Sequence, residues 1–322
     1  MLLSVLSCAS SPPQPPAWVL DAEVVYPAEA YIAQPGRGSD RRMAELAGIQ
    51  AISRWFASEV KSSVSAGRSY SEQDGAASQS TQVDEQVFVQ SQTQLFAVRY
   101  TEAWYNERAS EGEVLAYIDR AEAWAIYEPA LRQKADAFRS LYRAAEADAE
   151  SIKQFYLYQA ARAIAPELEQ MLGFASVLYP GRAAAFHGVR DTIAELPQKT
   201  DSARTNADIY IDCPADQERT LYAALARVFG GLGFPIRQDS EAASAVCATR
   251  INENMQQLEA GTFYAPGITL SLTGKTGPLF TWNAAAQRTG AFNTEIARNR
   301  AYAALAREIE KKPRGGICPR EE

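Results

Sequence analysis

The chain has 322 residues, which suggests two domains, and its 47% hydrophobic and 22% charged residues are ordinary proportions for a globular protein. A net charge of -7 and a pI near 5.1 argue against a nucleic-acid surface, because phosphate binding needs clustered lysine and arginine. No apolar run approaches the roughly 20 residues of a membrane-spanning helix, so any membrane attachment must come from the N-terminus.

The N-terminus carries a cysteine in a distinctive setting. Val5–Cys8 resembles a lipobox, in which branched apolar residues and a small residue precede the cysteine that receives diacylglycerol, and residues 10–16 form a Ser/Pro-rich tether. Each buried acyl methylene contributes about 0.8 kcal/mol, so two or three chains anchor firmly. Only seven residues precede Cys8 and none is basic, unlike a secretory signal. We therefore expect the true start codon to lie upstream; the alternative is a cytosolic protein with a chance apolar start.

The remaining cysteines and the single histidine limit the chemistry. No C-x-x-C pair occurs, and one histidine excludes a His/Cys zinc site of the usual spacing, so we expect no metal and no cofactor. Cys213 and Cys247 could form a disulfide in an oxidising compartment. An equally favoured alternative is that Cys213 and Cys247 are unbridged and serve only as small buried residues on strands. The redox state of Cys318 is left open.

Residues 18–128 predict a first α+β domain. Residues 35–38 are expected to form a tight turn, after which Ser39 or Asp40 caps a helix. Apolar residues recur along that helix at three- and four-residue steps, at Met43, Leu46, Ile49, Ile52, Phe56, Val60 and Val64.

Two strands, at residues 95–105 and 113–127, are expected to follow that helix and to form a hairpin. The alanine content of the second run alone would allow a helix. Aromatic and β-branched residues at its apolar positions favour a strand.

Residues 129–196 are rich in Ala, Glu and Arg and predict helices. Pro166 and Pro180 should break them into three, because proline removes a helical hydrogen bond. The polar residues 197–206 predict a linker. Residues 205–312 then predict a second sheet domain of order β-α-β-β-β-β-α. In it, residues 207–213 alternate as a strand, the glycines at 230–233 end the first helix, and the last helix runs from about Thr294 to Glu310. The expected fold class is α+β, with two small sheet-plus-helix domains joined by a helical segment and preceded by the anchor and tether of residues 1–17.

These patterns resemble known envelope proteins. Residues 16–18, the Gly36–Gly38 segment with its following helix, and the strand at 100–104 are similar to the LPP-twenty bacterial lipoprotein family over about the first third of the chain. That family also resembles the N-terminal part of FlgT-type flagellar assembly proteins, which implies a surface or flagellar role for some members. Residues 207–312, above all the strand-turn-strand at 270–282, resemble TolB-N-terminal and curli-secretion domains. The resemblance implies protein–protein contacts and no catalytic residues.

Several features are weighed as candidate sites. Gly36–Gly38 before a helix could hold an anion, but without a third glycine a simple turn is favoured. His187 has no nucleophile or orienting partner in any motif. Acidic residues flank the expected hairpin and could be paired acid and base, although solvated surface is favoured: Glu102, Glu107, Glu111 and Glu113.

Four aromatic residues, Trp104, Tyr105, Tyr117 and Trp124, are expected either to pack in the core or to form an exposed face that grips a partner. The favoured interpretation of the whole chain is a non-enzymatic lipoprotein, anchored to a membrane facing the periplasm or cell surface, that binds unidentified envelope proteins as a scaffold or assembly factor. The alternative is a lipoprotein that binds a small ligand or glycan between its domains. A hydrolase that uses carboxylates alone is the least favoured, and self-association is left open.

Overall fold

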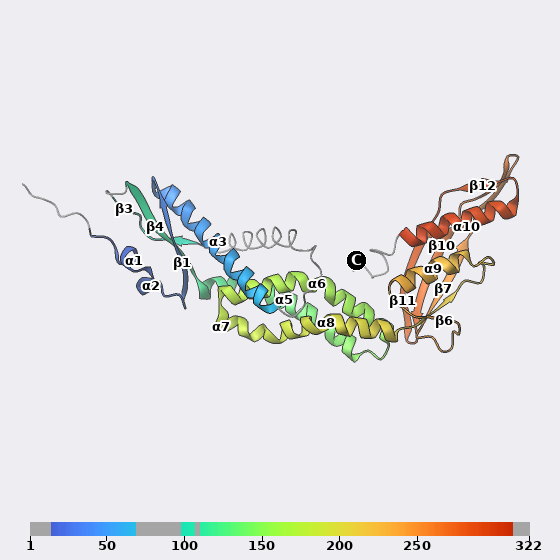
Figure 1. Ribbon diagram of the computed structural model, residues 1–322, viewed down its shortest axis with the longest axis horizontal. Helices are drawn as coiled ribbons and strands as arrows, with labels where there is room; N and C mark the ends of the chain where they lie inside the picture. The colour runs from blue at the N-terminus through green and yellow to red at the C-terminus, as the bar shows by residue number, and fades with distance from the viewer. Residues whose placement is uncertain (1–13, 69–97, 107–109, 312–322) are drawn as a thin grey trace, which may run out of the picture. The chain divides into compact units, whose positions relative to one another are not determined.

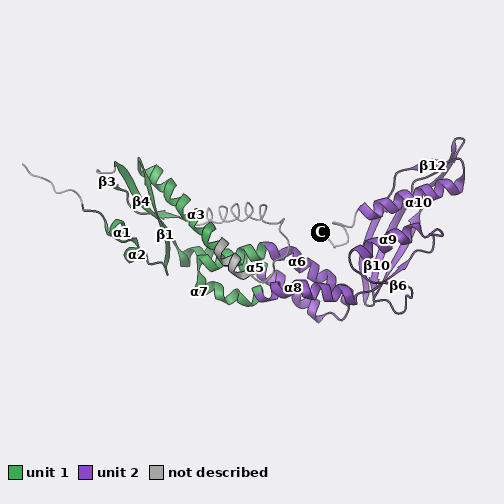
Figure 2. Ribbon diagram, in the orientation of Figure 1, with its two compact units in different colours: residues 1–134, 167–190 green, residues 135–166, 191–322 purple. Residues whose placement is uncertain are grey.

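The computed structural model describes residues 14–68, 98–106 and 110–311 (Figure 1). Contacts divide the chain into two compact units, residues 1–134 with 167–190 and residues 135–166 with 191–322 (Figure 2). The dividing points fall inside three helices, α5 (Arg120–Ala147), α6 (Ser151–Leu178) and α8 (His187–Asn206). This division differs from the expected one, which treated residues 129–196 as a segment of their own.

The first unit contains a four-stranded antiparallel sheet. Its central strand is β4, which pairs with β1 on one side and with β2 and β3 on the other. The pairing of β3 with β4 bears out the expected hairpin, but residues 101–103 divide the first expected strand into two. The strands and helices of this unit before α5 are α1 (Ala17–Leu20), α2 (Ala22–Val25), β1 (Tyr31–Gly38), α3 (Arg41–Arg68), β2 (Arg99–Tyr100), β3 (Trp104–Asn106) and β4 (Glu111–Asp119).

The Gly36–Gly38 segment is not a turn but the end of β1, and its glycines let α3 approach the sheet closely. A β-carbon on Gly36 would lie 2.5 Å from the amide nitrogen of Gly48 in α3. One on Gly48 would lie 2.7 Å from the β-carbon of Ala116 in β4. Only glycine fits such a close approach, so this segment serves helix packing and not anion binding.

Helix α3 begins as expected, and Ile52, Phe56 and Val60 of the expected stripe are buried. The Asp40 Oδ1 accepts a hydrogen bond from the Met43 amide at 2.9 Å, which confirms the predicted N-cap. Met43 and Leu46 are about half exposed, contrary to the expected stripe. The small residues Ala44 and Gly48 face the glycines of β1. The buried positions of α3 follow a four-residue step and are Ala44, Gly48, Ile52, Phe56 and Val60.

The expected strand at residues 113–127 is a strand only as far as Asp119. The Asp119 Oδ1 accepts hydrogen bonds from the amides of Ala121 and Glu122, at 2.8 and 3.0 Å, so it caps α5. The alanine-rich half of the run is therefore helical, as its composition alone had allowed. The same capping carboxylate ends the strand and begins the helix.

One of the two expected proline breaks does not occur, and neither does the predicted linker. Pro166 lies inside α6 and Pro197 inside α8, so the predicted linker at 197–206 is helix. Both helices bury apolar residues on each side of the proline, Ala165 and Leu168 in α6 for example, and this packing offsets the lost hydrogen bond. Pro180 does mark a boundary, as the first residue of α7 (Pro180–Ala183), which the 3-10 turn η1 (Ala184–Phe186) follows.

A buried guanidinium fastens the end of α6 inside the first unit. Arg120 donates to the carbonyls of Val177 and Leu178 at 2.6 and 2.5 Å and to the Ala28 carbonyl at 2.8 Å. The last carbonyls of a helix have no partner within the helix, so Arg120 satisfies groups that would otherwise be buried unpaired. Burial lowers the pKa of this arginine.

The second unit contains a five-stranded mixed sheet of order β11-β10-β7-β5-β6. Strand β5 is parallel to its neighbours β6 and β7, and the other pairs are antiparallel. Helices α9 and α10 pack against each other and lie on one face of this sheet (Figure 1). The elements are β5 (Ile209–Asp212), α9 (Thr220–Gly231), β6 (Ile236–Arg237), β7 (Ala245–Asn252), β10 (Gly267–Gly274), β11 (Gly277–Ala285) and α10 (Thr294–Lys311).

A separate three-stranded sheet of order β12-β9-β8 packs under α10, where Tyr264 and two alanines of the helix form a small core. Its strands are β8 (Met255–Leu258), β9 (Gly261–Tyr264) and β12 (Thr289–Ala291). The expected order β-α-β-β-β-β-α omitted these short strands. Both units combine helices with antiparallel sheet, so the predicted α+β class is confirmed.

Candidate functional site

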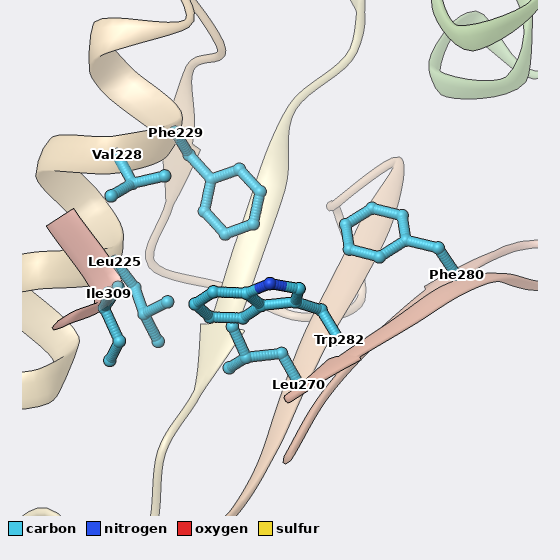
Figure 3. A pocket seen from close by; sticks show the side chains of 7 residues that line it. All are labelled: Leu225, Val228, Phe229, Leu270, Phe280, Trp282 and Ile309. Carbon is cyan, nitrogen blue, oxygen red and sulfur yellow. The ribbon is translucent and has the colours of Figure 1, made fainter. Parts of the chain in front are cut away.

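An apolar pocket lies in the second unit between the helix layer and the strands β10 and β11. Its volume is about 10 Å³, which is room for about one water molecule. In Figure 3, Trp282 lies in the middle of the lining side chains, between Phe229 and Leu270. The lining residues carry no charge and are Leu225, Val228, Phe229, Leu270, Phe280, Trp282 and Ile309.

The pocket follows from the alternation of β10 and β11 and from the apolar stripe of α9. Leu270 pairs with Trp282 in the antiparallel register, so both side chains point to the helix face. Asp216 fixes the start of α9, because its carboxylate accepts from the amides of Thr220 and Tyr222 at 3.0 and 2.8 Å. Phe280 also meets Tyr156 of α6, with ring centroids 5.6 Å apart. The sequence pattern of each element does not by itself indicate that α9, β10 and β11 enclose a pocket.

The four aromatic residues of the expected interaction face do not share one surface. Tyr105 is 54% exposed, whereas Trp124 is 3% exposed inside α5 and donates to Glu128 Oε2 at 2.7 Å. Trp124 packs edge-on against Tyr179 and is therefore core.

Trp104 and Tyr117 are half-buried and lie on the same face of the first sheet, because Trp104 pairs with Glu113 four residues before Tyr117. Tyr105 points to the other face. Tyr117 packs against Tyr26 at 4.5 Å between ring centroids. Whether these residues contact a partner stays a prediction.

Cys213 and Cys247 are free thiols in the described part of the chain. In the parallel register Ile211 pairs with Cys247 and Asp212 with Ala248. Cys213, the next residue, therefore lies opposite Thr249 and diagonal to Cys247. Such diagonal neighbours have Cα atoms roughly 7–8 Å apart, beyond the usual reach of a disulfide. Burial raises the pKa of Cys247 to about 12. A bridge would need the backbone to move.

The weighed acid, base and anion candidates occupy structural or surface positions. Glu113 is buried and lies 3.5 Å from the Arg37 guanidinium, so its charge is paired. Glu102, Glu111 and His187 are exposed. Glu107, like Cys8 and Cys318, lies outside the described residues.

A buried carboxylate that sequence reasoning missed lies at the start of β5. Asp208 Oδ1 accepts from the Ser244 amide and hydroxyl at 2.7 and 2.6 Å, and Arg237 pairs with Oδ2. Burial alone would raise the pKa of Asp208, but these hydrogen bonds and the guanidinium outweigh it and lower the pKa. The group ties β5, β6 and the start of β7 together, so it is structural.

The helices that the structure describes include none with the length and apolarity to cross a membrane. Over the same residues, no three or more His, Cys, Asp or Glu side chains gather in a way that could hold a metal ion.

Comparison with known proteins yields distant structural likenesses. No family model matches the chain, and no curated protein matches its sequence. A minor lipoprotein from Acinetobacter baumannii is 17% identical and covers 36% of this chain and 96% of its own, with a TM-score of 0.25. The secreted protein HP1454 from Helicobacter pylori is 9% identical and covers 88% of this chain and 98% of its own, with a TM-score of 0.33. The LPP-twenty resemblance therefore stays a prediction from the sequence.

Proposed function

We propose that this protein is a non-enzymatic lipoprotein of the bacterial cell envelope, anchored through acyl chains on Cys8, and that it acts as a scaffold or assembly factor through protein–protein contacts. The observation that carries the proposal is the order of the N-terminal features. Val5–Cys8 is followed by the Ser/Pro-rich residues 10–16, and the first helix, α1, begins directly afterwards at Ala17. An acylated cysteine and a short tether place a folded body beside a bilayer.

The electrostatics of the folded part support a scaffold. Groups with displaced pKa values are the usual candidates for catalysis, but here they hold elements together. Arg120 caps the end of α6, and Asp208 joins β5 to β6. Tyr302, whose pKa burial raises to about 12, donates to Glu253 at 2.7 Å and so ties α10 to the sheet region.

The pocket favours apolar protein contact over a glycan. Glycan and small-molecule sites place a few polar groups to orient the ligand, whereas the lining from Leu225 to Ile309 consists of aliphatic side chains, two phenylalanines and one tryptophan. Clusters of aromatic and aliphatic side chains are typical of the centres of protein interfaces. We therefore propose a protein partner rather than a glycan.

Membrane attachment is tested by expressing the full genomic reading frame in a bacterium and separating membranes by ultracentrifugation. We expect the wild-type protein in the membrane pellet and Cys8→Ser in the soluble fraction, because serine cannot accept the thioether-linked lipid. Cys318→Ser is the matched control and should stay in the pellet. Finding the wild-type protein in the soluble fraction would contradict anchoring through Cys8, and so would a Cys8→Ser variant that still pellets.

The non-enzymatic part of the proposal has its own test. Purified protein is incubated with isolated peptidoglycan, and soluble fragments are measured by liquid chromatography. We expect no release above a heat-denatured sample. Release that is lost on heating would make the protein a hydrolase and would contradict the scaffold role.

A further inference from the structure

The edge of the larger sheet formed by β11 is long and lacks charge. β11 is the last strand in the sheet order, and no described strand pairs with its other side. Its sequence from Gly277 to Ala285 contains no charged residue. Pro278 and a shift of register near Leu279 interrupt its start, which leaves Phe280–Ala285 as a regular run. An edge strand of this kind is a template for pairing with another strand.

Two of the other sheet edges, β1 and β6, are protected by the usual means. β1 forms an edge of the first sheet, but it carries Pro35 and the exposed Arg37. The opposite edge of the larger sheet is β6, which has two residues and the ion-paired Arg237. Short strands, prolines and charges all disfavour edge pairing. β11 is longer than β6, and unlike both of these edges it carries no charged residue.

We propose that a second copy of this chain pairs with β11 edge to edge, in antiparallel orientation, so that two five-stranded sheets form one continuous sheet. A two-fold axis brings the same patch of both copies together and makes the two strands antiparallel. Because β11 has no charge, self-pairing brings no like charges together. The segment Phe280–Ala285 can pair with the same segment of the second copy. When the two-fold axis passes near Thr281 or Trp282, the helix-facing aromatic side chains of one copy meet those of the other.

Phe280 and Trp282 make the second copy a better fit than an arbitrary strand. Both are half-buried and both line the apolar pocket. Directly opposed aromatic side chains on neighbouring strands stabilise the pair. The outward side chains, Thr281 and Asn283, are exposed, small and polar, and impose no clash. Six paired residues form a small interface, so the dimer should dissociate on dilution.

The association is tested with the full chain carrying Cys8→Ser, so that acyl chains cannot assemble the protein and the result does not depend on the anchor. Light scattering over a concentration series should give twice the chain mass at high concentration and the single mass on dilution. Thr281→Lys adds a charge at the edge and should raise the dissociation constant roughly tenfold or more. Thr273→Lys, equally exposed on β10, should leave it unchanged.

A cross-link locates the interface. In a background with Cys8→Ser and Cys318→Ser, Thr281→Cys should give a covalent dimer with a bismaleimide short enough to bridge only neighbouring residues. Thr273→Cys should not, because Thr273 lies on β10 and the β11 strands of both copies separate it from its counterpart. A single-chain mass at every concentration would overturn the proposal. So would equal effects at positions 273 and 281, whether in dissociation constant or in cross-linking.

Discussion

Gly48 of α3 lies against Ala116 of β4, so close that a β-carbon on the glycine would be 2.7 Å from the alanine β-carbon. Gly36 of β1 completes the contact on the neighbouring strand, 2.5 Å from the Gly48 amide nitrogen by the same measure. Helix and sheet therefore meet backbone to backbone. The packing of the first unit depends on these two positions having no side chain.

Gly36→Ala should therefore destabilise the protein strongly. The added methyl would meet backbone atoms of α3, which cannot move aside as a flexible side chain can, so we expect a loss of about 3 kcal/mol or more in the free energy of unfolding. Urea unfolding followed by circular dichroism measures it. Gly188→Ala is the control, because a β-carbon there meets nothing within 4 Å, and it should be neutral or stabilising by up to about 1 kcal/mol. Similar losses in both variants would refute the close contact.

Removing the guanidinium of Arg120 should also be costly. Arg120→Met keeps most of the side-chain volume but leaves the carbonyls of Val177 and Leu178 without their donor, and each unsatisfied buried group costs about 1–3 kcal/mol. The exposed ion pair of Arg132 with Glu128 provides the comparison, and Arg132→Met should change the free energy of unfolding by less than about 1 kcal/mol. Equal effects would show that Arg120 does not cap α6.

Asp208 should make stability depend on pH in the acid range. Its folded pKa lies below the unfolded value, so its stabilisation is fully present above the unfolded pKa of about 4 and is lost as the pH falls through the lower folded value. Asp208→Asn should lower the free energy of unfolding at pH 7 by about 1–3 kcal/mol and by less near pH 3. Asp201→Asn, in an exposed ion pair, should show no such dependence. A constant difference for Asp208→Asn at both pH values would contradict the assignment.

The two described cysteines should differ in reactivity and should not be bridged. Cys247 is 1% exposed and burial raises its pKa to about 12, so it should resist N-ethylmaleimide at pH 8 in the native protein, while the half-buried Cys213 should be labelled slowly. In urea without reductant both should react. Peptide mass spectrometry reads each site. Failure of both cysteines to react in urea until a reductant is added would reveal a disulfide and a local register different from that of β5 and β7.

Local signals in the sequence predicted several elements of the second unit well. The alternation at residues 207–213 became β5, and the helix expected from Thr294 to about Glu310 is α10 to within a residue. The glycines at 230–233 end α9 as expected. In each case the signal is a helix cap, a turn or the alternation of a strand, and each of these depends on residues only a few positions apart.

The errors arose where distant contacts decide the outcome. Gly36–Gly38 has the composition of a turn, and only the approach of α3 explains why a strand needs glycine there. Pro166 and Pro197 are helix breakers by local chemistry, but packing on both sides keeps α6 and α8 continuous. The pocket draws on four elements between residues 225 and 309, so no local pattern could indicate it.

The anchor at Cys8 is the central claim, and the mass of the N-terminal peptide tests it most directly. The full genomic reading frame is expressed in a bacterium, the purified protein is digested, and the peptide is measured by mass spectrometry. We predict that it begins at Cys8 and carries a diacylglycerol group, with or without a further acyl chain on the amine. An unmodified peptide that begins at Met1 would contradict the anchor and the envelope placement together.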